Sequence, residues 1–171
     1  MKHFETDRLL LTPSGIGDAS FYLELLNTPK WLQNIGDRNV KSIEDSKTYI
    51  EQKMLPQLER LGFSNYTVIR KSDNIKLGCC GLYDREGIDG FDIGFAFLPA
   101  YEKMGYAYES AFKLKEVAIT QFKIKKISAI TIPENKSSQK LLEKLDFNFI
   151  KIITIPNDNE KLMLYEYKTS S

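Results

Sequence analysis

The sequence predicts one α/β domain in which helices pack on the faces of a mixed β-sheet. Strand-like and helix-like segments follow the coarse order βααβββαβαββ, and such alternation is typical of a layered α/β architecture. Three successive strands in the middle of the chain disfavour a purely parallel, doubly wound sheet. The length of 171 residues and the hydrophobic fraction of 42% fit one folded domain that spans residues 1–171.

The first third of the chain contains one strand and two helices. A leucine-rich strand over 8–12 ends before a Pro-Ser-Gly turn. An aspartate can cap a helix over 18–26, whose apolar residues share one face. A turn-rich stretch over 27–39 follows. A capping box then opens a helix over 42–61, which Pro56 interrupts.

The rest of the chain contains three strands, a long amphipathic helix and a closing strand–helix–hairpin unit. In the long helix, small and apolar residues recur near the helical period. The expected bounds are 66–70, 77–83 and 91–98 for the three strands, 105–122 for the long helix, 126–132 for the next strand, 137–145 for a short helix, and 147–155 and 162–167 for the hairpin.

Histidine and cysteine are too scarce for several common catalytic chemistries. The chain has 1 His, which is His3, and 2 Cys, which are the adjacent Cys79 and Cys80. Ser-His-Asp and Cys-His mechanisms would have to use His3, and a zinc site of Cys and His ligands is excluded, so no metal is expected. The cysteines fit packing positions in an apolar strand, and a covalent role as nucleophiles is the alternative.

The charge balance gives no reason to expect nucleic acid or a membrane as a partner. The formal net charge is +1, from 24 Lys and Arg against 23 Asp and Glu. No apolar run approaches the ~20 residues that span a bilayer, and no signal peptide is visible. Adjacent cysteines fit a reduced compartment. We therefore expect a cytoplasmic protein.

The segment before the long helix has the pattern of an anion-binding loop. A strand ends at Pro99, and Gly105 opens the helix. Successive backbone N–H groups at a helix N-terminus can surround an anion, and Lys103 adds a mobile cation. The alternative is an ordinary strand-to-helix turn in which the glycine only relieves strain.

The segment before the short helix has polar residues that can serve two purposes. A strand ends at Pro133, and Asn135 and Ser138 follow one helical turn apart. Asn135 can cap the helix, and the two side chains can also face a ligand from the same side. Capping and ligand contact are compatible, so this segment does not distinguish them.

Four stretches together resemble a known family. They are Glu-Thr-Asp-Arg-Leu-Leu-Leu over 5–11, Leu-Gly-Cys-Cys-Gly-Leu over 77–82, Asp-Ile-Gly-Phe with Leu-Pro and Gly-Tyr-Ala-Tyr-Glu-Ser-Ala over 92–111, and Pro-Glu-Asn-x-x-Ser-x-x-Leu-Leu-Glu-Lys-Leu-Asp-Phe over 133–147. This combination resembles the GCN5-related N-acetyltransferase (GNAT) superfamily, and within it the RimJ/RimL-like ribosomal-protein acetyltransferases. The resemblance implies a mostly antiparallel sheet with helices on both faces. It also implies a V-shaped splay between the fourth and fifth strands.

The resemblance implies acetyl-CoA as co-substrate and assigns roles to residues along both segments. The loop would bind the CoA pyrophosphate through its N–H groups, and the splayed strand would pair with the pantetheine arm. The amide of Phe97 or Leu98 would polarise the thioester carbonyl, and Ser138 would hydrogen-bond the thiolate leaving group. The residues expected to contact acetyl-CoA are Phe95, Ala96, Phe97, Leu98, Lys103, Met104, Gly105, Tyr106, Ala107, Asn135 and Ser138.

Two of the departures from the family's pattern bear on the site, whereas a third, Asp146 in place of the usual Gly, affects a turn. Glu102 stands where the family has Gln or Arg, and we expect this carboxylate to point to solvent. Leu142 stands at about the position where some members have a general-acid Tyr, which leaves Ser138 as the better candidate.

The acceptor is expected to be an amine that loses its proton easily. A Lys ε-amine (pKa ~10.4) is much further from neutrality at pH 7 than an α-amine (pKa ~8), and no imidazole is available as a base. Asp92 could take the proton through water, and a strand-end surface carboxylate is the alternative reading. Trp31, Asp37 and Arg38 fall in a stretch that resembles the family's acceptor-facing loop. Trp31 could equally be a core residue.

These features favour transfer of the acetyl group to a protein or peptide N-terminus. Acetylation of a small amine, such as a polyamine, an aminoglycoside or an amino acid, is the alternative within enzymes. A non-catalytic acyl-CoA-binding module is the alternative of another class. The sequence is compatible with a monomer or a homodimer.

Overall fold

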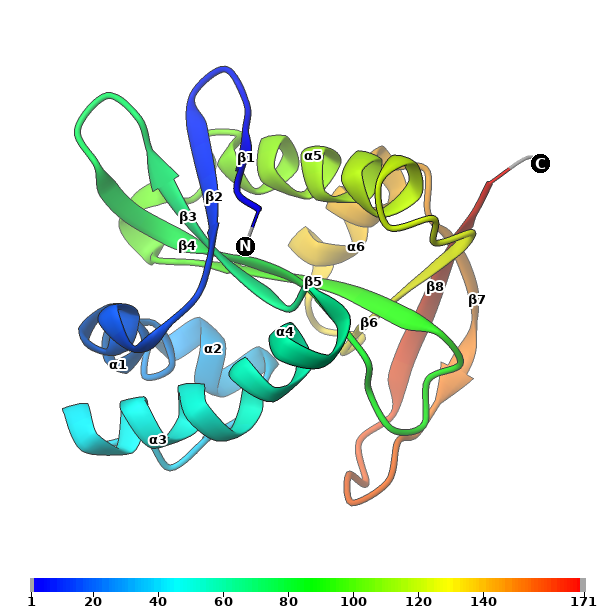
Figure 1. Ribbon diagram of the computed structural model, residues 1–171. Helices are drawn as coiled ribbons and strands as arrows, with labels where there is room; N and C mark the ends of the chain where they lie inside the picture. Colours follow the sequence, from blue (N-terminus) through cyan, green and yellow to red (C-terminus); the bar gives the residue numbers. More distant parts are fainter. Residues whose placement is uncertain (1, 170–171) are drawn as a thin grey trace.

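The computed structural model describes residues 2–169, which form one eight-stranded sheet with helices on both of its faces (Figure 1). The strands are β1 (Phe4–Glu5), β2 (Leu9–Pro13), β3 (Asn65–Arg70), β4 (Ile75–Tyr83), β5 (Phe91–Phe97), β6 (Lys126–Thr131), β7 (Asn148–Ile153) and β8 (Leu162–Lys168). The helices are α1 (Ala19–Leu25), α2 (Pro29–Asn34), α3 (Ile43–Lys53), α4 (Leu55–Leu61), α5 (Tyr106–Thr120) and α6 (Lys136–Lys144), with 3₁₀ turns η1 (Ile16–Asp18) and η2 (Pro99–Tyr101).

The sheet is mixed and mostly antiparallel, as the sequence predicts. Its strand order is β1-β2-β3-β4-β5-β6-β8-β7, and β5 and β6 form its parallel pair. The other neighbouring strands pair antiparallel. A parallel pair needs a crossover, which here is the long helix α5 between β5 and β6.

The two parallel strands diverge after a short common stretch. Only Phe91 and Asp92 of β5 pair with β6, opposite Ile127 and Ser128, although β5 continues to Phe97. Beyond this point, no strand formed by residues 2–169 lies beside the edge of β5 that faces β6. This is the V-shaped splay that the family resemblance implies between the fourth and fifth long strands.

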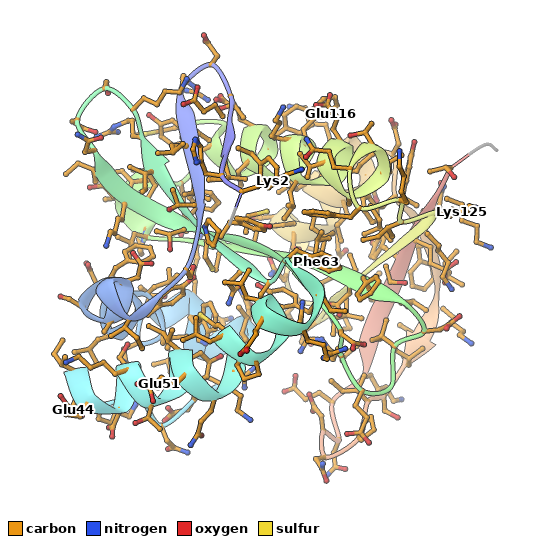
Figure 2. The ribbon with its side chains drawn as sticks, viewed as in Figure 1. Lys2, Glu44, Glu51, Phe63, Glu116 and Lys125 are labelled. Carbon is orange, nitrogen blue, oxygen red and sulfur yellow. The ribbon has the colours of Figure 1, made fainter. Side chains whose placement is uncertain are left out.

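The sheet separates two hydrophobic clusters. One contains Leu114 of α5 and Leu142 of α6, packed on the sheet together with Phe63, which precedes β3. The other contains residues of α1 and α3, together with Cys79 of β4 and Leu98. Figure 2 shows Phe63 in the interior, whereas the charged side chains of Glu44 and Glu51 on α3 lie at the outside of the molecule.

The helix expected over 42–61 is two helices. Ser42 caps α3 by accepting a hydrogen bond from the Asp45 amide, in agreement with the capping box. The helix is interrupted at Met54. The next helix, α4, has Pro56 in its first turn, where the missing N–H of proline removes no hydrogen bond within the helix.

The stretch over 27–39 contains a helix that the sequence reading missed. Thr28 caps α2 by accepting from the Trp31 amide, and Pro29 occupies its first turn. Thr-Pro is a recognisable helix start, but the six-residue length and the flanking turn residues hide it. Strand β1 was also not expected, since two residues give no periodicity. Within residues 2–169, no helix combines the length and apolar character needed to cross a membrane.

Candidate active site

The strand register decides which amides of β5 are free to meet a ligand. The Leu98 N–H donates to the Leu77 carbonyl of β4 at 2.9 Å, so Leu98 and Leu77 form a hydrogen-bonded antiparallel pair. Backbone direction alternates along a strand, and the Ala96 N–H therefore also points to β4, whereas those of Phe95 and Phe97 point away from it, into the splay. The expectation that the Leu98 N–H could stabilise the oxyanion is therefore wrong, because this N–H is already bonded to β4. The Phe97 N–H remains the candidate.

Backbone turns shape the loop between β5 and α5. Lys103 has φ 62° and Gly105 has φ 83°, both in the left-handed region, and α5 starts directly afterwards at Tyr106. These turns direct the chain into α5. The first N–H groups of the helix have no partner inside it, so they are available to a ligand. Lys103 and Met104 are exposed, Tyr106 is buried, and Ala107 lies between these extremes. The N-terminus of α5, with its partial positive charge and exposed N–H groups, therefore has the geometry of an anion-binding site.

Arg8 holds the start of α5, and the sequence reading did not identify it. Its Nε donates to Glu109 at 2.7 Å, its backbone N–H donates to the same carboxylate at 3.0 Å, and its Nη1 donates to the Met104 carbonyl at 3.1 Å. Thr6 also donates to Glu109. An acidic residue in the first turn of a helix was the one available signal, but its partner lies 101 positions away.

Glu102 does not point to solvent. Its carboxylate pairs with Lys30 of α2 and its side chain is only 22% exposed. The loop that leads into α5 is therefore tied to the helix at the start of the acceptor-facing stretch. The expectation failed because nothing local in either segment indicates that α2 lies near this loop.

Asn135 and Ser138 lie in one cap at the start of α6. The Asn135 side-chain oxygen accepts from the Ser138 N–H at 3.2 Å, so Asn135 is the N-cap. The Ser138 hydroxyl is half-buried and has no hydrogen-bond partner within residues 2–169, which leaves it free to donate to a ligand. Leu142, one turn further along, is buried in the core and cannot act as an acid.

Asp92 is a buried carboxylate and not a strand-end surface residue. Its residue exposure is 1%, and Arg85 contacts it from Nε at 3.2 and 3.3 Å and from Nη2 at 3.3 Å. The Arg85 guanidinium also lies over the Tyr83 ring, 5.4 Å from its centroid. Burial raises the pKa of Asp92, and the Arg85 charge opposes that rise without cancelling it.

The three residues expected near the acceptor lie on α2 and the loop after it. Trp31 packs against the cluster of α1, α3, Cys79 and Leu98, and its buried Nε1 has no hydrogen-bond partner among the described residues. Asp37 is exposed and pairs with Lys41 at 3.1 Å. The Asn39 amide and the Lys41 side chain lower the pKa of Asp37. Arg38 is exposed.

The two cysteines are poor nucleophiles. Both are free thiols and buried. Burial raises the pKa of Cys79 to about 12 and raises that of Cys80 further, so neither forms a thiolate near neutral pH. This disfavours the covalent alternative.

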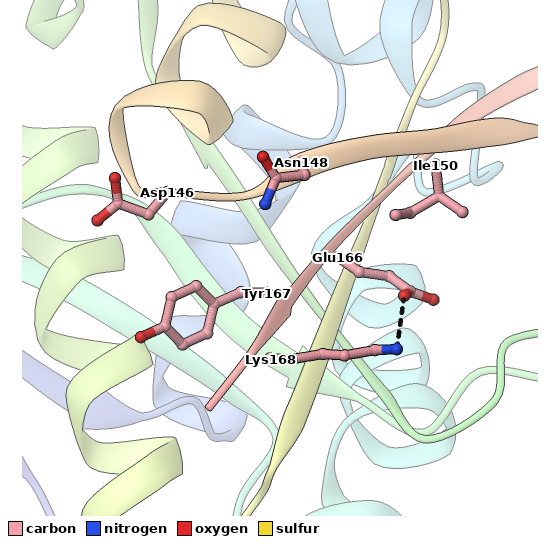
Figure 3. Close-up of a pocket in the computed structure, with 6 residues that line it drawn as sticks. All are labelled: Asp146, Asn148, Ile150, Glu166, Tyr167 and Lys168. Carbon is pink, nitrogen blue, oxygen red and sulfur yellow. Dashed lines mark ion pairs between the residues drawn. The ribbon is translucent and has the colours of Figure 1, made fainter. Parts of the chain in front are cut away.

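Two surface pockets lie apart from most of the residues expected to form the site. Figure 3 shows one of about 310 Å³ over β7 and β8 that contains none of the expected site residues. Another, of about 550 Å³, lies over the first turns of α5 and is lined by Arg8, Gly105 and Glu109 among others. Among residues 2–169, no three His, Cys, Asp or Glu side chains gather in a way that could hold a metal ion.

The fold, the splay and the loop before α5 define an acetyltransferase of the GNAT class, and the family comparison agrees. Residues 8–148 match the model of the acetyltransferase (GNAT) domain. The chain belongs to this family of acyltransferases, which use acetyl-CoA and an amine acceptor.

Relatives span almost the whole chain. The uncharacterized N-acetyltransferase YnaD of Bacillus subtilis (strain 168) is 26% identical over 168 residues, which cover 96% of this chain and 95% of that protein. The ribosomal-protein-S5-alanine acetyltransferase of Vibrio fischeri superposes with a TM-score of 0.82 at 17% identity, covering 100% of this chain and 98% of its own. The ribosomal L7/L12 α-N-protein acetyltransferase RimL, solved with coenzyme A, gives 0.82 at 16% identity and 98% coverage of both. At these identities the two structures show a shared fold.

The described residues fit acetyl-CoA. Two β5 amides, at Phe95 and Phe97, are directed into a gap with no neighbouring strand, where an extended arm with amide groups can pair with them. The helix start after Gly105 is suited to a pyrophosphate, and the Ser138 hydroxyl is free to donate.

Proposed function

We propose that this protein transfers the acetyl group directly to the α-amine of a protein or peptide N-terminus, as a member of the RimJ/RimL-like branch. The observation that carries the proposal is the state of Asp92, the one candidate base: it is buried and already bound by Arg85. The single histidine, His3, precedes the edge strand β1. A site this poor in free bases suits an amine whose pKa lies near neutrality.

The roles follow the geometry of the splay. The amine nitrogen attacks the thioester carbonyl, whose oxygen the Phe97 N–H stabilises as negative charge develops. The C–S bond then breaks, and Ser138 donates a hydrogen bond or proton to the leaving thiolate. The proton lost by the amine passes through water toward Asp92. The structural likeness to two ribosomal-protein acetyltransferases supports the choice of acceptor.

The test is release of CoA from acetyl-CoA against a panel of acceptors. We expect turnover with peptides that have a free N-terminus, and little with the same peptides when they are N-acetylated but contain lysine. Small amines form the third group. Faster turnover of a polyamine, an aminoglycoside or a free amino acid would contradict the proposal. Thermal stabilisation by acetyl-CoA without CoA release on any acceptor would indicate a binding module.

Ser138 can be tested in the same assay against its neighbour. Ser138→Ala should lower kcat about 100-fold or more, because proton transfer to a leaving group contributes on that scale. Ser137 is exposed on the same helical turn, so Ser137→Ala is the matched control and should keep its kcat. Equal kcat values for the two variants would assign protonation of the thiolate to solvent.

A further inference from the structure

Asp92 lies where the two parallel strands separate, on the face of the sheet that α1 and α3 cover. It is the last residue of β5 that pairs with β6, opposite Ser128. Side chains alternate along a strand, so Asp92 shares a face with Ala96, which packs against the cluster of α1 and α3. The Asp92 side chain is only 2% exposed, so the protein must supply the charge that stabilises its carboxylate.

Arg85 supplies this charge from the loop that follows β4. Its Nε donates to both carboxylate oxygens of Asp92, at 3.2 and 3.3 Å, and its Nη2 donates to one of them at 3.3 Å. The Arg85 side chain is 33% exposed, so water reaches the arginine far more than the carboxylate. Removing one partner of such a pair leaves a buried charge without compensation.

Tyr83 holds Arg85 in place from the strand beside Asp92. Tyr83 and Asp92 are cross-strand partners in β4 and β5, so their side chains share a face. The guanidinium carbon of Arg85 lies 5.4 Å from the centre of the Tyr83 ring, within the range of a cation–π contact. The Tyr83 hydroxyl donates to the side-chain oxygen of Asn65 on β3, which fixes the far end of the ring.

Two glycines form a slot for this ring. Gly81 and Gly94 are cross-strand partners on β4 and β5. A Cβ on Gly94 would lie 2.9 Å from Cε2 of Tyr83, and one on Gly81 would lie 2.7 Å from the Tyr83 hydroxyl oxygen. Both distances are shorter than a van der Waals contact, so the ring lies directly on the backbone of the two strands. The slot fixes the ring and, through the ring, the cation stacked on it.

The charged groups on the β6 side of Asp92 are already paired with each other. Ser128 lies opposite Asp92 on β6, and Glu166 lies opposite Ser128 on β8. Glu166 pairs with Lys126 at 3.7 Å. This pair is neutral as a whole and does not replace the charge of Arg85.

The phenols on this face do not change the charge around Asp92 near neutral pH. Burial raises the pKa of Tyr83 well above its ordinary value. Burial also raises the pKa of Tyr49, a titratable residue of α3 that packs on the same face. Both hydroxyls therefore stay neutral, and Arg85 is the charge that opposes the effect of burial on Asp92.

We propose that Arg85 is a positioning residue that keeps the Asp92 carboxylate charged and in place, and that Tyr83 in its glycine slot holds Arg85. This rests on the proposed role of Asp92 as the base. In that role the carboxylate must be ionised before the amine proton arrives through water. A guanidinium stays protonated throughout, so Arg85 itself takes no proton.

The direct test is a carbon-13 NMR titration of the Asp92 carboxyl group in aspartate-labelled protein, with Asp92→Asn identifying its signal. Arg85→Met should raise the pKa of Asp92 by about 1–3 units, because burial is then unopposed. Arg60→Met is the matched control, since Arg60 pairs at 2.8 Å with Asp84 and both side chains are exposed. An unchanged titration in Arg85→Met, or an equal rise in Arg60→Met, would overturn the proposal.

The kinetic test uses a peptide with a free N-terminus and divides kcat/KM of each variant by that of the wild type at each pH. This ratio cancels the titration of the acceptor amine. For Arg85→Met it should be lowest at acidic pH and recover as the pH rises through the raised pKa of Asp92. Arg85→Lys keeps a positive charge and should restore most of the ratio. Tyr83→Leu should act in the same direction as Arg85→Met but less strongly.

A double variant separates action through Asp92 from direct contact with the substrate. In the Asp92→Asn background, Arg85→Met should cause no further loss of activity, because no carboxylate is left to hold. A further loss there, or a ratio that is equally low at every pH, would make Arg85 a substrate contact and overturn the positioning role. If Asp92→Asn keeps wild-type kinetics, Asp92 is not the base and the proposal fails with it.

Failure of the proposed function has a different signature. If no peptide is acetylated, N-terminal acetylation is wrong, and the NMR titration alone decides whether Arg85 keeps Asp92 charged. Thermal melting of Arg85→Met and Tyr83→Leu distinguishes a lost contact from a lost fold.

Discussion

At the scale of single residues, strand register determines which backbone N–H groups of β5 are free to bind a ligand. Phe97 and Leu98 are neighbours with similar side chains, yet only the Phe97 N–H points into the splay, because the Leu98 N–H donates to Leu77. No property of either side chain distinguishes them. For Asp92 the side chain itself is the functional group. Its burial and its ion pair with Arg85 determine the pKa of the carboxyl group.

Asp92→Asn should change the pH profile of kcat/KM. As a base, Asp92 must be ionised, so activity should fall as pH drops through its pKa, which burial holds above the ordinary value of about 3.9. The variant should lose this acidic limb and about 100-fold or more in kcat/KM near neutral pH. Asp89→Asn, on a side chain that is 97% exposed, is the control. Because Arg85 loses its partner, thermal melting should accompany the kinetics, and an unchanged profile would exclude Asp92 as the base.

At the scale of elements, contacts between distant segments hold the loop before α5. Glu102 lies in this loop, and Glu109 lies in the first turn of α5 that follows it. Glu109 binds the turn between β1 and β2, and Glu102 binds α2. The start of α5 is thus fixed from two directions. A fixed loop presents its amides to an anion without an ordering cost at binding.

Glu109→Gln should raise the KM for acetyl-CoA about 2- to 5-fold with little change in kcat. The reason is loss of the ion pair with Arg8, whose value at a partly exposed site is about 0.2–1 kcal/mol. Glu116→Gln changes the same charge on the same helix, where Glu116 pairs with Lys113 away from the loop, and should leave KM unchanged. Equal effects from both variants would argue for a general charge effect over loop positioning.

At the scale of the whole molecule, the splay lies between the two hydrophobic clusters. The face of α5 and α6 carries the groups expected to bind acetyl-CoA, and the face of α1–α4 carries those expected to bind the acceptor (Figure 1). If acetyl-CoA binds in the opening between β5 and β6 as proposed, its thioester would be accessible from both faces of the sheet. The cores on the two sides must therefore support a sheet that is incomplete at its centre.

Leu114→Ala should lower the free energy of unfolding by about 2–5 kcal/mol, because it creates a cavity under the sheet where Leu114 is fully buried. Phe112 lies on the same helix with 46% exposure, so Phe112→Ala should cost less than about 1 kcal/mol. Urea unfolding of both variants measures the difference. Similar losses would mean that Leu114 contributes no more to the core than the half-exposed Phe112.

Much of the fold follows from local pattern. The long strands and the long helix lie where apolar periodicity and turn residues indicate them, and Ser42 and Asn135 cap the predicted helices. The failures are short elements, α2 and β1, which contain too few residues for a period to show. Of the site, the residues that follow strand ends were recognisable, while the contacts of Arg8 and Arg85 were not.

The sequence by itself determined the order of elements, the two loops that precede α5 and α6, and the absence of any histidine but His3. Only the tertiary structure decided that Phe97 and not Leu98 faces the splay, that Glu102 meets Lys30, and that Asp92 is buried beside Arg85. The physical reason is the range of the interactions. Caps, turns and amphipathic faces depend on residues within one or two turns, whereas register, ion pairing and burial depend on segments that are brought together from far apart in the chain.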